Sequence, residues 1–232
     1  MKKIVGIIPA RGGSKGIPRK NLYDFCGKPL IAYTIEAGLA SKYIDKVVLS
    51  TEDDEIAEVA KKFGAEVIKR PDELAQDKTK TAPVLVQVVE ELKKQGYQPD
   101  IIVTLQPTSP LRGSDVIDEV IEKLKNTDCD SVFAGNKVFK YQPRWDRAEN
   151  GILKALYDYH LRPRRQEVTE YCYEENGAVY AITGEAFEKY QDMLGNKVEV
   201  VEMNPIDSAE LDTNFDLILI EQLMQYKALH KY

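Results

Sequence analysis

Residues 7–21 of the chain read IIPARGGSKGIPRKN, and this stretch decides the fold that we expect. It begins as the end of a short apolar strand over residues 3–8, and a loop with Gly12, Gly13 and Gly16 follows directly. Because glycine lacks a Cβ atom, backbone N–H groups in such a loop can approach an anion closely. A strand that leads into a glycine-rich loop is typical of an α/β protein that binds phosphate groups.

Four cations lie in this loop with no acid between them: Arg11, Lys15, Arg19 and Lys20. The whole chain carries a net charge of −6, so this positive cluster is opposite in sign to the net charge of the protein. Such a local field attracts a polyanion and can stabilise the charge that develops on a leaving pyrophosphate. The alternative is a solvated surface loop. The strand before the loop and the undiluted positive charge favour a triphosphate site.

The spacing of the glycines is neither that of the common P-loop nor G-x-G-x-x-G, because Ile17 and Pro18 follow Gly16. The string A-R-G-G-S-K-G-x-P-x-K-N resembles the N-terminal signature of the acylneuraminate cytidylyltransferases, the CMP-sialic acid synthetase family. That family activates nine-carbon 2-keto sugar acids with CTP. The resemblance extends over essentially the whole chain. It implies CTP contacts at Arg11, Gly12, Gly13, Ser14, Lys15, Lys20 and Asn21.

Length and composition indicate an ordinary globular protein with a single domain over residues 1–232. The resemblance implies that it is a nucleotidyltransferase domain. Of the 232 residues, 43% are hydrophobic and 30% are charged, so a substantial core can form. The acidic balance argues against a general nucleic-acid binder. The first apolar run ends at Ile8, which is too short for a signal peptide or a membrane span. We therefore expect no nucleic-acid or membrane partner.

The cysteines Cys26, Cys129 and Cys172 are odd in number and widely spaced. This pattern favours reduced thiols in a cytoplasmic protein over a disulfide framework or a zinc site.

Strand-like and helix-like segments alternate along the chain. The expected strands are 4–8, 47–50, 101–105, 131–134 and 178–182, with shorter ones at 66–68 and 198–201. The expected helices are 53–63, one capped by Thr81, one capped by Ser114, and 214–229. This order predicts a three-layer α/β/α fold with a mostly parallel, Rossmann-like sheet. Since ligands bind at the carboxyl ends of such strands, the glycine-rich loop and Gln106 should meet in one cleft.

Residues from about 136 to 175 break this rhythm. They are rich in aromatic and arginine side chains, among them Trp145, Tyr159 and Arg164, and they have no helical period. We expect an extended, partly β excursion, since such side chains favour interface cores. The resemblance implies that this segment projects, forms a homodimer and completes the sugar site.

Two positions after a short strand are candidate nucleotide contacts. Arg70 begins the segment R-P-D-E-L-A, which alone is more often a surface turn. In the resembled family a matching segment helps to enclose CTP, and Thr81 falls where a polar contact to cytosine is expected. Thr81 is also a suitable helix cap, and the two roles are compatible.

The segment L-Q-P-T-S-P-L-R, residues 105–112, ends the strongest internal strand. Two prolines stiffen the turn, and a neutral Gln at a strand end can hydrogen-bond a sugar or base. The string matches the family almost letter for letter. By that resemblance Gln106 contacts the sugar acid, whereas Arg112 pins the turn.

A sugar acid needs a cation for its carboxylate, and arginine offers a two-pronged match. In the family an R-Q pair before an N-G-A-x-Y strand supplies this contact. We assign that role to Arg165 and Gln166, with Tyr180 near the sugar. Arg164 remains the alternative to Arg165.

Four acids lie within residues 207–216: Asp207, Glu210, Asp212 and Asp216. A simple helix cap is one interpretation, since the helix dipole favours acids there. The family has D-x-D-T where this chain has E-x-D-T. Alternate residues of an extended strand share a face, so Glu210 and Asp212 can hold Mg²⁺ (or Mn²⁺) beside phosphate oxygens. Asp212 is the stronger candidate; Asp207 and Asp216 are weaker.

The sequence therefore predicts a CMP-nonulosonate synthetase, in which the anomeric hydroxyl of the sugar acid attacks the α-phosphate of CTP and pyrophosphate leaves. Arg11, Lys15, Lys20 and Asp212 are the expected catalytic residues. The general base is not identified. Alternatives are an eight-carbon octulosonate as substrate, a pseudaminate-like or legionaminate-like acid in place of sialate, and a non-catalytic module that senses CTP or a CMP-sugar.

Overall fold

The computed structural model describes residues 2–140, 143–161 and 163–230, with the side chain of Arg165 left out. Within these residues a seven-stranded sheet has the order β11-β7-β10-β6-β1-β4-β5. Its strands are β1 (Ile4–Pro9), β4 (Lys46–Thr51), β5 (Glu66–Lys69), β6 (Ile101–Leu105), β7 (Ser131–Phe139), β10 (Tyr171–Thr183) and β11 (Val198–Glu202). All seven predicted strands are therefore present.

The sheet is parallel except at β10. Strand β1 pairs in parallel with β4 and β6, so that Ile7 lies beside Val48 on one side and Thr104 on the other. Strand β10 runs antiparallel to both β6 and β7. Because of this reversal, the amino end of β10 lies at the edge where β1, β4 and β6 have their carboxyl ends.

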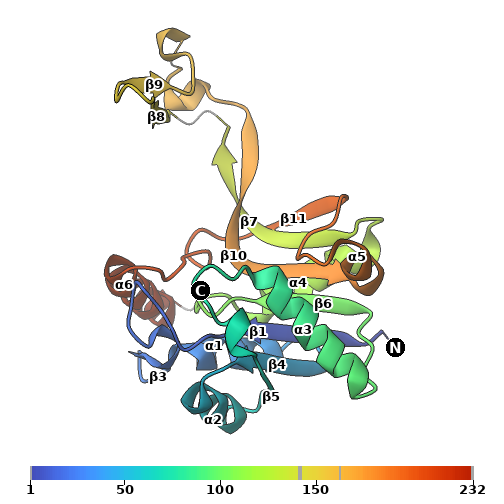
Figure 1. Cartoon of the computed structure of the whole chain (residues 1–232). Coiled ribbons are helices and arrows are strands. Elements are labelled where there is room, and N and C mark those ends of the chain that lie inside the picture. The colour runs from blue at the N-terminus through green and yellow to red at the C-terminus, as the bar shows by residue number, and fades with distance from the viewer. Residues whose placement is uncertain (1, 141–142, 162, 231–232) are drawn as a thin grey trace.

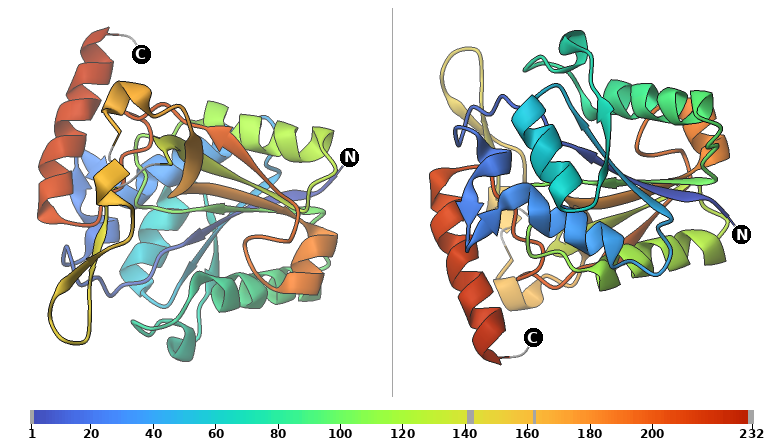
Figure 2. Two further views of the ribbon diagram at one scale, coloured as in Figure 1. Left: turned by 90° about the horizontal axis from the view of Figure 1, so that it is seen from above. Right: turned by 90° about the horizontal axis from the view of Figure 1, so that it is seen from below.

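Helices cover both faces of the sheet, as Figure 2 shows for α3 (Thr81–Lys94) and α4 (Ser114–Asn126) on opposite sides. The first hydrophobic core lies under α1 (Leu30–Leu39), α2 (Asp54–Lys62) and α4. The second lies under α3 and α5 (Gly184–Tyr190). The prediction of a three-layer α/β/α fold with a mostly parallel sheet is confirmed.

Two predicted helix caps were wrong by one residue. Thr81 and Ser114 are the first residues of α3 and α4, and the capping positions are Lys80 and Gly113, neither with a side-chain capping bond. By contrast, Asp53 does cap α2, accepting a hydrogen bond of 3.0 Å from the N–H of Ile56.

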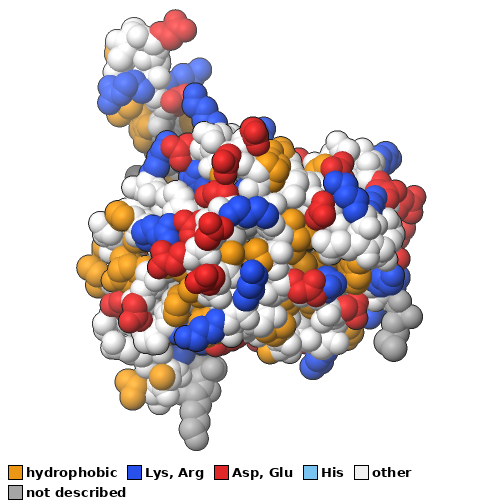
Figure 3. Space-filling model, turned by 60° about the horizontal axis from the view of Figure 1, so that its bottom comes forward, with side chains coloured by type: hydrophobic (Ala, Val, Ile, Leu, Met, Phe, Trp, Pro, Cys, Tyr) orange, Lys and Arg blue, Asp and Glu red, His pale blue; other side chains and the backbone are white. Residues whose placement is uncertain are grey.

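The helix α6 (Asn214–His230) packs beside a small hairpin of β2 (Asp24–Phe25) and β3 (Lys28–Pro29). Ile17, in the glycine-rich loop, is buried in the same cluster with Leu111, Leu211 and Ile220. The packing of Ile17 against Ile220 and its neighbours therefore holds the glycine-rich loop against α6. The outer side of α6 exposes Phe215, Ile218 and Leu229, and Figure 3 shows hydrophobic side chains gathered at the left, where Figure 1 draws this helix.

The described residues between 136 and 175 form an arm that rises from the sheet as a continuation of β7 and β10 (Figure 1). At its base, four residues of β10 between Glu175 and Tyr180 face one residue of β7, between Gly135 and Phe133. This bulge contains Gly177, with φ of +72°, a conformation that favours glycine. It redirects the strand out of the sheet.

The far end of the arm carries the hairpin of β8 (Trp145–Arg147) and β9 (Leu153–Ala155), followed by short 3₁₀ turns at Tyr159–Leu161 and Arg165–Glu167. Trp145 stacks on Tyr159 at a ring distance of 5.6 Å, and Ile152, Leu156 and Leu161 are exposed. The domain division and the dimerisation role of this segment stay predictions. In the described part of the chain, no helix is long and apolar enough to cross a membrane.

Candidate active site

Four predicted site residues from separate segments line one cavity of about 140 Å³. Arg11 follows β1, Arg70 follows β5, Gln106 follows β6, and Thr81 begins α3. We call this the carboxyl-edge cavity, because the strands before these residues end beside it. The parallel sheet brings the motifs together as the sequence predicts.

The glycine-rich loop passes very close to acidic segments from elsewhere in the chain. The N–H of Gly12 donates to Glu52 Oε1 at 2.7 Å, and a Cβ on Gly12 would lie 2.6 Å from Asp53 Oδ2. A Cβ on Gly16 would lie 2.2 Å from the backbone oxygen of Asp212, whereas one on Gly13 would have no atom within 4 Å. Two of the three glycines are thus needed for close packing, and the phosphate-binding role of all three stays a prediction.

The loop cations are paired with acids, although the loop itself contains none. Asp77 accepts from Arg11 Nη1 at 2.8 Å and lies 3.0 Å from Lys15 Nζ. Lys20 Nζ donates to the backbone oxygen of Leu211 at 3.0 Å and to Asp212 Oδ1 at 3.1 Å. Arg11, Lys15 and Lys20 therefore each have an acidic partner from a distant part of the chain.

The backbone of the loop is tied down by Asn21, which is buried and donates from Nδ2 to the carbonyl of Arg11 at 2.8 Å. Ser14 is partly exposed between the cations. Asn21 therefore shapes the loop here, and its contact with CTP stays a prediction.

We expect Asp77→Asn to tighten nucleotide triphosphate binding about three- to tenfold at low salt. The Asp77 carboxylate competes for Arg11 and Lys15, and the amide removes that negative charge without changing the shape of the side chain. Isothermal titration with CTP would measure the change, with Asp192→Asn, on the exposed surface far along the chain, as the matched control. An unchanged or weaker affinity would contradict the competition.

Arg19, one of the four loop cations, has a left-handed backbone conformation, with φ of 55°. Its guanidinium pairs with Asp53, and Nη2 also donates to Glu55 at 2.5 Å. The hydrogen bond from Arg19 is the largest of the causes that hold the pKa of Asp53 below its usual value. This pair ties the glycine-rich loop to the start of α2.

Asp53→Asn should lower the free energy of unfolding at pH 7 by about 0.5–1 kcal/mol, because asparagine keeps the helix cap but loses the charge pair. A carboxyl with a lowered folded-state pKa contributes stability above about pH 4 and loses it as the pH falls through the folded value. Urea unfolding of both proteins at pH 7 and pH 3 would therefore show a gap that closes on acidification. A gap as wide at pH 3 as at pH 7 would mean that the charge is not its cause.

Arg70 forms a fixed wall of the carboxyl-edge cavity. It is only 4% exposed, and its Nη2 donates to the carbonyl of Ser50 at 2.8 Å while Nε donates to Ser50 Oγ at 3.2 Å. Burial lowers the pKa of Arg70, and the nearby Glu52 partly offsets that effect. The guanidinium is thus held before any ligand arrives.

Tyr180 lies in the carboxyl half of β10, opposite Thr104 of β6 and two positions in register from Gln106. It is buried, and its hydroxyl donates to Glu175 Oε2 at 2.9 Å. Burial and this hydrogen bond raise the pKa of Tyr180 above its usual value. Tyr180 therefore lies in the strand next to β6, near the carboxyl end of β6 that Gln106 follows.

The predicted R-Q pair, Arg165 and Gln166, belongs to a 3₁₀ turn of the arm, and Gln166 is not among the residues that line the carboxyl-edge cavity. Gln166 is exposed in the arm, and the side chain of Arg165 lies outside the described residues. Arg164 pairs with Glu167, with Nε at 2.8 Å from Oε1. Their contact with a sugar acid stays a prediction.

The acidic segment before α6 supplies two carboxylates at this edge. Thr108 Oγ1 donates to Glu210 Oε1 at 3.2 Å, and Asp212 pairs with Lys20. Desolvation by the surrounding protein is the largest cause that raises the pKa of Glu210, and the negative charge of Asp212 is the second. Asp216, in the first turn of α6, accepts from the N–H groups of Asp212 and Thr213, and Asp207 pairs with Lys227.

The expected strand geometry of this segment is not observed, since residues 209–213 have no regular structure. Within the described residues no group of three His, Cys, Asp or Glu side chains is placed to hold a metal ion. Glu210 and Asp212 are close enough to interact electrostatically, so these two carboxylates could share a cation with groups from a ligand.

A family model described as cytidylyltransferase matches residues 5–231. The chain belongs to this family. Pseudaminic acid cytidylyltransferase of Campylobacter jejuni is 36% identical over 97% of both chains. N-acylneuraminate cytidylyltransferase A of Danio rerio is 36% identical over 95% of this chain and 50% of its own length. CMP-N,N'-diacetyllegionaminic acid synthase of Legionella pneumophila is 31% identical over 96% of this chain and 97% of that one.

The solved structure of CMP:2-keto-3-deoxy-manno-octonic acid synthetase complexed with CTP has the same fold, with a TM-score of 0.71 over 97% of this chain and all of that one, at 19% identity. The resemblance to the CMP-sialic acid synthetase family is therefore confirmed. The protein is a nucleotidyltransferase enzyme.

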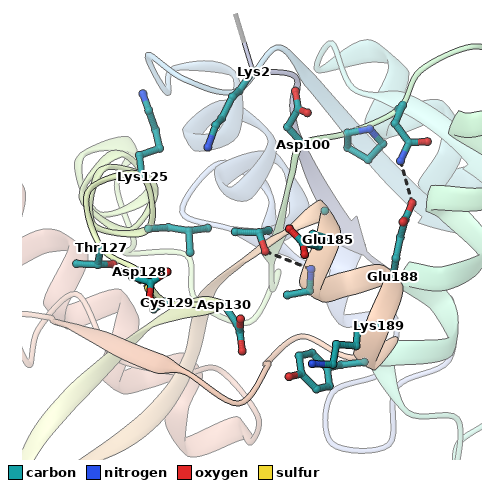
Figure 4. Close-up of a pocket in the computed structure, with 17 residues that line it drawn as sticks. Lys2, Asp100, Lys125, Thr127, Asp128, Cys129, Asp130, Glu185, Glu188 and Lys189 are labelled. Atoms are coloured by element: carbon teal, nitrogen blue, oxygen red, sulfur yellow. Dashed lines mark hydrogen bonds between the residues drawn. The ribbon is translucent and has the colours of Figure 1, made fainter.

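A larger cavity of about 660 Å³ in this cytidylyltransferase lies at the opposite edge of the sheet (Figure 4). It is lined by residues at the start of β6 and β7 and the end of β10, among them Asp100, Asp130 and Thr183. The predicted site residues do not line it. Size alone therefore does not identify the site in this family member.

Sequence reasoning missed Asp77 and Glu52. Glu52 follows β4, so the rule that ligands bind where parallel strands end could have found it. Asp77 lies in an irregular loop between Leu74 and Thr81, and its pairing with Arg11 across 66 residues has no sequence signal.

Proposed function

We propose that this enzyme transfers CMP from CTP to the anomeric hydroxyl of a nonulosonic acid and releases pyrophosphate. The carboxyl-edge cavity carries the proposal, because Arg11, Arg70, Thr81 and Gln106 all line it. Lys20, from the same loop as Arg11, pairs with Asp212 of the acidic segment. The relatives' names add support, since they combine CMP or cytidylyl transfer with pseudaminic, acylneuraminic and legionaminic acids.

In this proposal Arg70 and Thr81 receive the nucleoside, because both line the cavity and Arg70 is fixed in its wall. Arg11, Lys15 and Lys20 exchange their carboxylate partners for the triphosphate. Gly12, Gly13, Ser14 and Asn21 shape the loop around it. Phosphate oxygens form charge-assisted hydrogen bonds with these cations, so the exchange conserves ion pairing.

The residues fit a divalent cation of the Mg²⁺ or Mn²⁺ type, which Glu210 and Asp212 would hold. Desolvation is the largest cause of the raised pKa of Glu210 and the charge of Asp212 the second, and a cation would relieve the repulsion between these two carboxylates. The cation supplies charge neutralisation at the phosphates when it is bound.

The reaction forms a bond from the anomeric oxygen to the α-phosphorus and breaks the bond from that phosphorus to the oxygen bridging to the β-phosphate. The hydroxyl loses its proton, and pyrophosphate leaves. Lys20 is well placed to offset the charge on the departing group, because its side chain is only 15% exposed and the interaction is weakly screened. Positioning and charge neutralisation carry most of the rate.

We propose that the sugar acid lies beside Gln106 and Tyr180, with Arg165 and Gln166 on its carboxylate. Since Gln166 lies in the arm, these groups would come from the partner protomer of a homodimer. The exposed Trp145, Ile152 and Leu161 of the arm are side chains that such an interface would cover.

Pyrophosphate release from CTP would test this function, with sialate, legionaminate, pseudaminate and the octulosonate each offered in turn with Mg²⁺. Turnover on one of the nine-carbon acids is the expected result, and it also identifies the substrate. CTP binding without turnover on any acid would favour a non-catalytic sensor, and turnover on the octulosonate alone would favour the eight-carbon alternative.

A further inference from the structure

Arg112 is a buried cation that no carboxylate neutralises in the described part of the chain. It is 2% exposed and belongs to the largest fully buried side chains. Its Nη2 donates to Thr34 Oγ1 at 3.1 Å and to the carbonyl of Gln106 at 3.4 Å, while Nε and Nη1 are buried without a partner. Burial lowers the pKa of Arg112 to about 10, and no acid offsets this effect. The side chain therefore stays charged at neutral pH.

An unpaired buried charge costs several kcal/mol of folding stability. A neutral side chain could hold the same two acceptors at a lower cost. Because the buried charge of Arg112 opposes folding, its presence points to a role in the candidate active site.

The guanidinium lies directly behind the turn that enters the active site. Gln106, whose carbonyl it holds, lines the carboxyl-edge cavity together with Arg11. Thr108, in the same turn, bonds to Glu210 and accepts from the N–H of Leu211 at 2.8 Å. The turn that Arg112 holds therefore contacts both the cavity lined by Arg11 and the acidic segment at Glu210.

We propose that Arg112 is a positioning residue that places a positive charge behind the Gln106 turn, where the anionic phosphates of the nucleotide act as its counter-charge. The inference rests on the proposed CTP-binding function. Because the guanidinium is buried, salt and water screen its field less than the fields of Arg11 and Lys15. The negative charge of the bound polyanion, and not a carboxylate of the free protein, then compensates for burying the Arg112 guanidinium.

Binding measurements on CTP and on uncharged cytidine separate this role from a structural one. Arg112→Met should weaken CTP binding about tenfold in isothermal titration and leave cytidine binding within twofold. Arg112→Lys, which keeps the charge, should restore CTP affinity to within about threefold of the unmodified protein. Loss of CTP and cytidine affinity together would overturn the proposal, and so would unchanged CTP affinity in Arg112→Met.

Where Arg112→Met does not fold, Thr34→Asp provides the test. The new carboxylate would replace the hydroxyl that accepts from Nη2 and would neutralise the guanidinium in place. The same selective loss for CTP is expected, and an equal loss for cytidine would overturn the proposal. Failure of the unmodified protein to bind CTP would count against the proposed function instead, which keeps the two outcomes distinct.

Discussion

Asp212→Asn should lower the kcat for pyrophosphate release about 10³-fold while CTP binding survives within about tenfold. Asparagine keeps the size of the side chain, so the loop packing changes little. It removes the negative charge that pairs with Lys20 at 3.1 Å and that, with Glu210, would hold the divalent cation. Groups that stabilise charge developing in a transition state have effects of this order when removed.

Asp207→Asn is the matched control, since Asp207 belongs to the same segment but pairs with Lys227 of α6. We expect its kcat to stay within about twofold. Raising the Mg²⁺ concentration should recover part of the activity of Asp212→Asn if Glu210 still holds the cation. Equal kcat values for the two variants would exclude Asp212 from the reaction.

The sheet was predictable because its strands are short apolar runs of about five residues between turn residues. Strand β6 is such a run, and its five residues are all buried; a run this short favours a strand over a helix by its length. Helix α1 was not predicted, because buried Leu30, Ile31, Ala32 and Ile35 lie too close together for a clear amphipathic stripe. Strand order, and the reversal of β10 above all, depends on contacts between distant residues that no local pattern contains.

The convergence of the site was predictable for a related reason: the carboxyl ends of parallel strands meet at one edge, so Arg11 and Gln106 had to lie near each other. The acids that pair with the loop cations were not predictable. Asp77 and Asp212 come from irregular segments, whose conformation depends on packing against Ile17 and α6 rather than on periodicity. The close contact of Gly16 with the backbone of Asp212, which also requires a small residue there, depends on the same packing.

Gly16→Ala should lower kcat/KM about 10²-fold and the free energy of unfolding by about 1–3 kcal/mol. Its Cβ would lie 2.2 Å from the backbone oxygen of Asp212, well inside van der Waals contact. A backbone atom cannot rotate away as a side chain does, so the loop and the acidic segment must separate. That shift moves Asp212 and the backbone oxygen of Leu211, which are the two acceptors of Lys20. A displacement of about 1 Å in a reacting group typically costs this much activity.

Alanine substitutions at Gly12 and Gly13 should destabilise the protein less than Gly16→Ala does. Gly12→Ala should be milder, because its Cβ would meet the end of the Asp53 side chain, which can move at the expense of the Arg19 pair. Gly13→Ala should leave the melting temperature unchanged, since no atom lies within 4 Å of its Cβ. Thermal unfolding and steady-state kinetics on all three variants would give the order Gly16, Gly12, Gly13 for loss of stability. The same loss in Gly13→Ala as in Gly16→Ala would mean that the loop is sensitive to any side chain, and that contact with Asp212 is not what requires glycine at position 16.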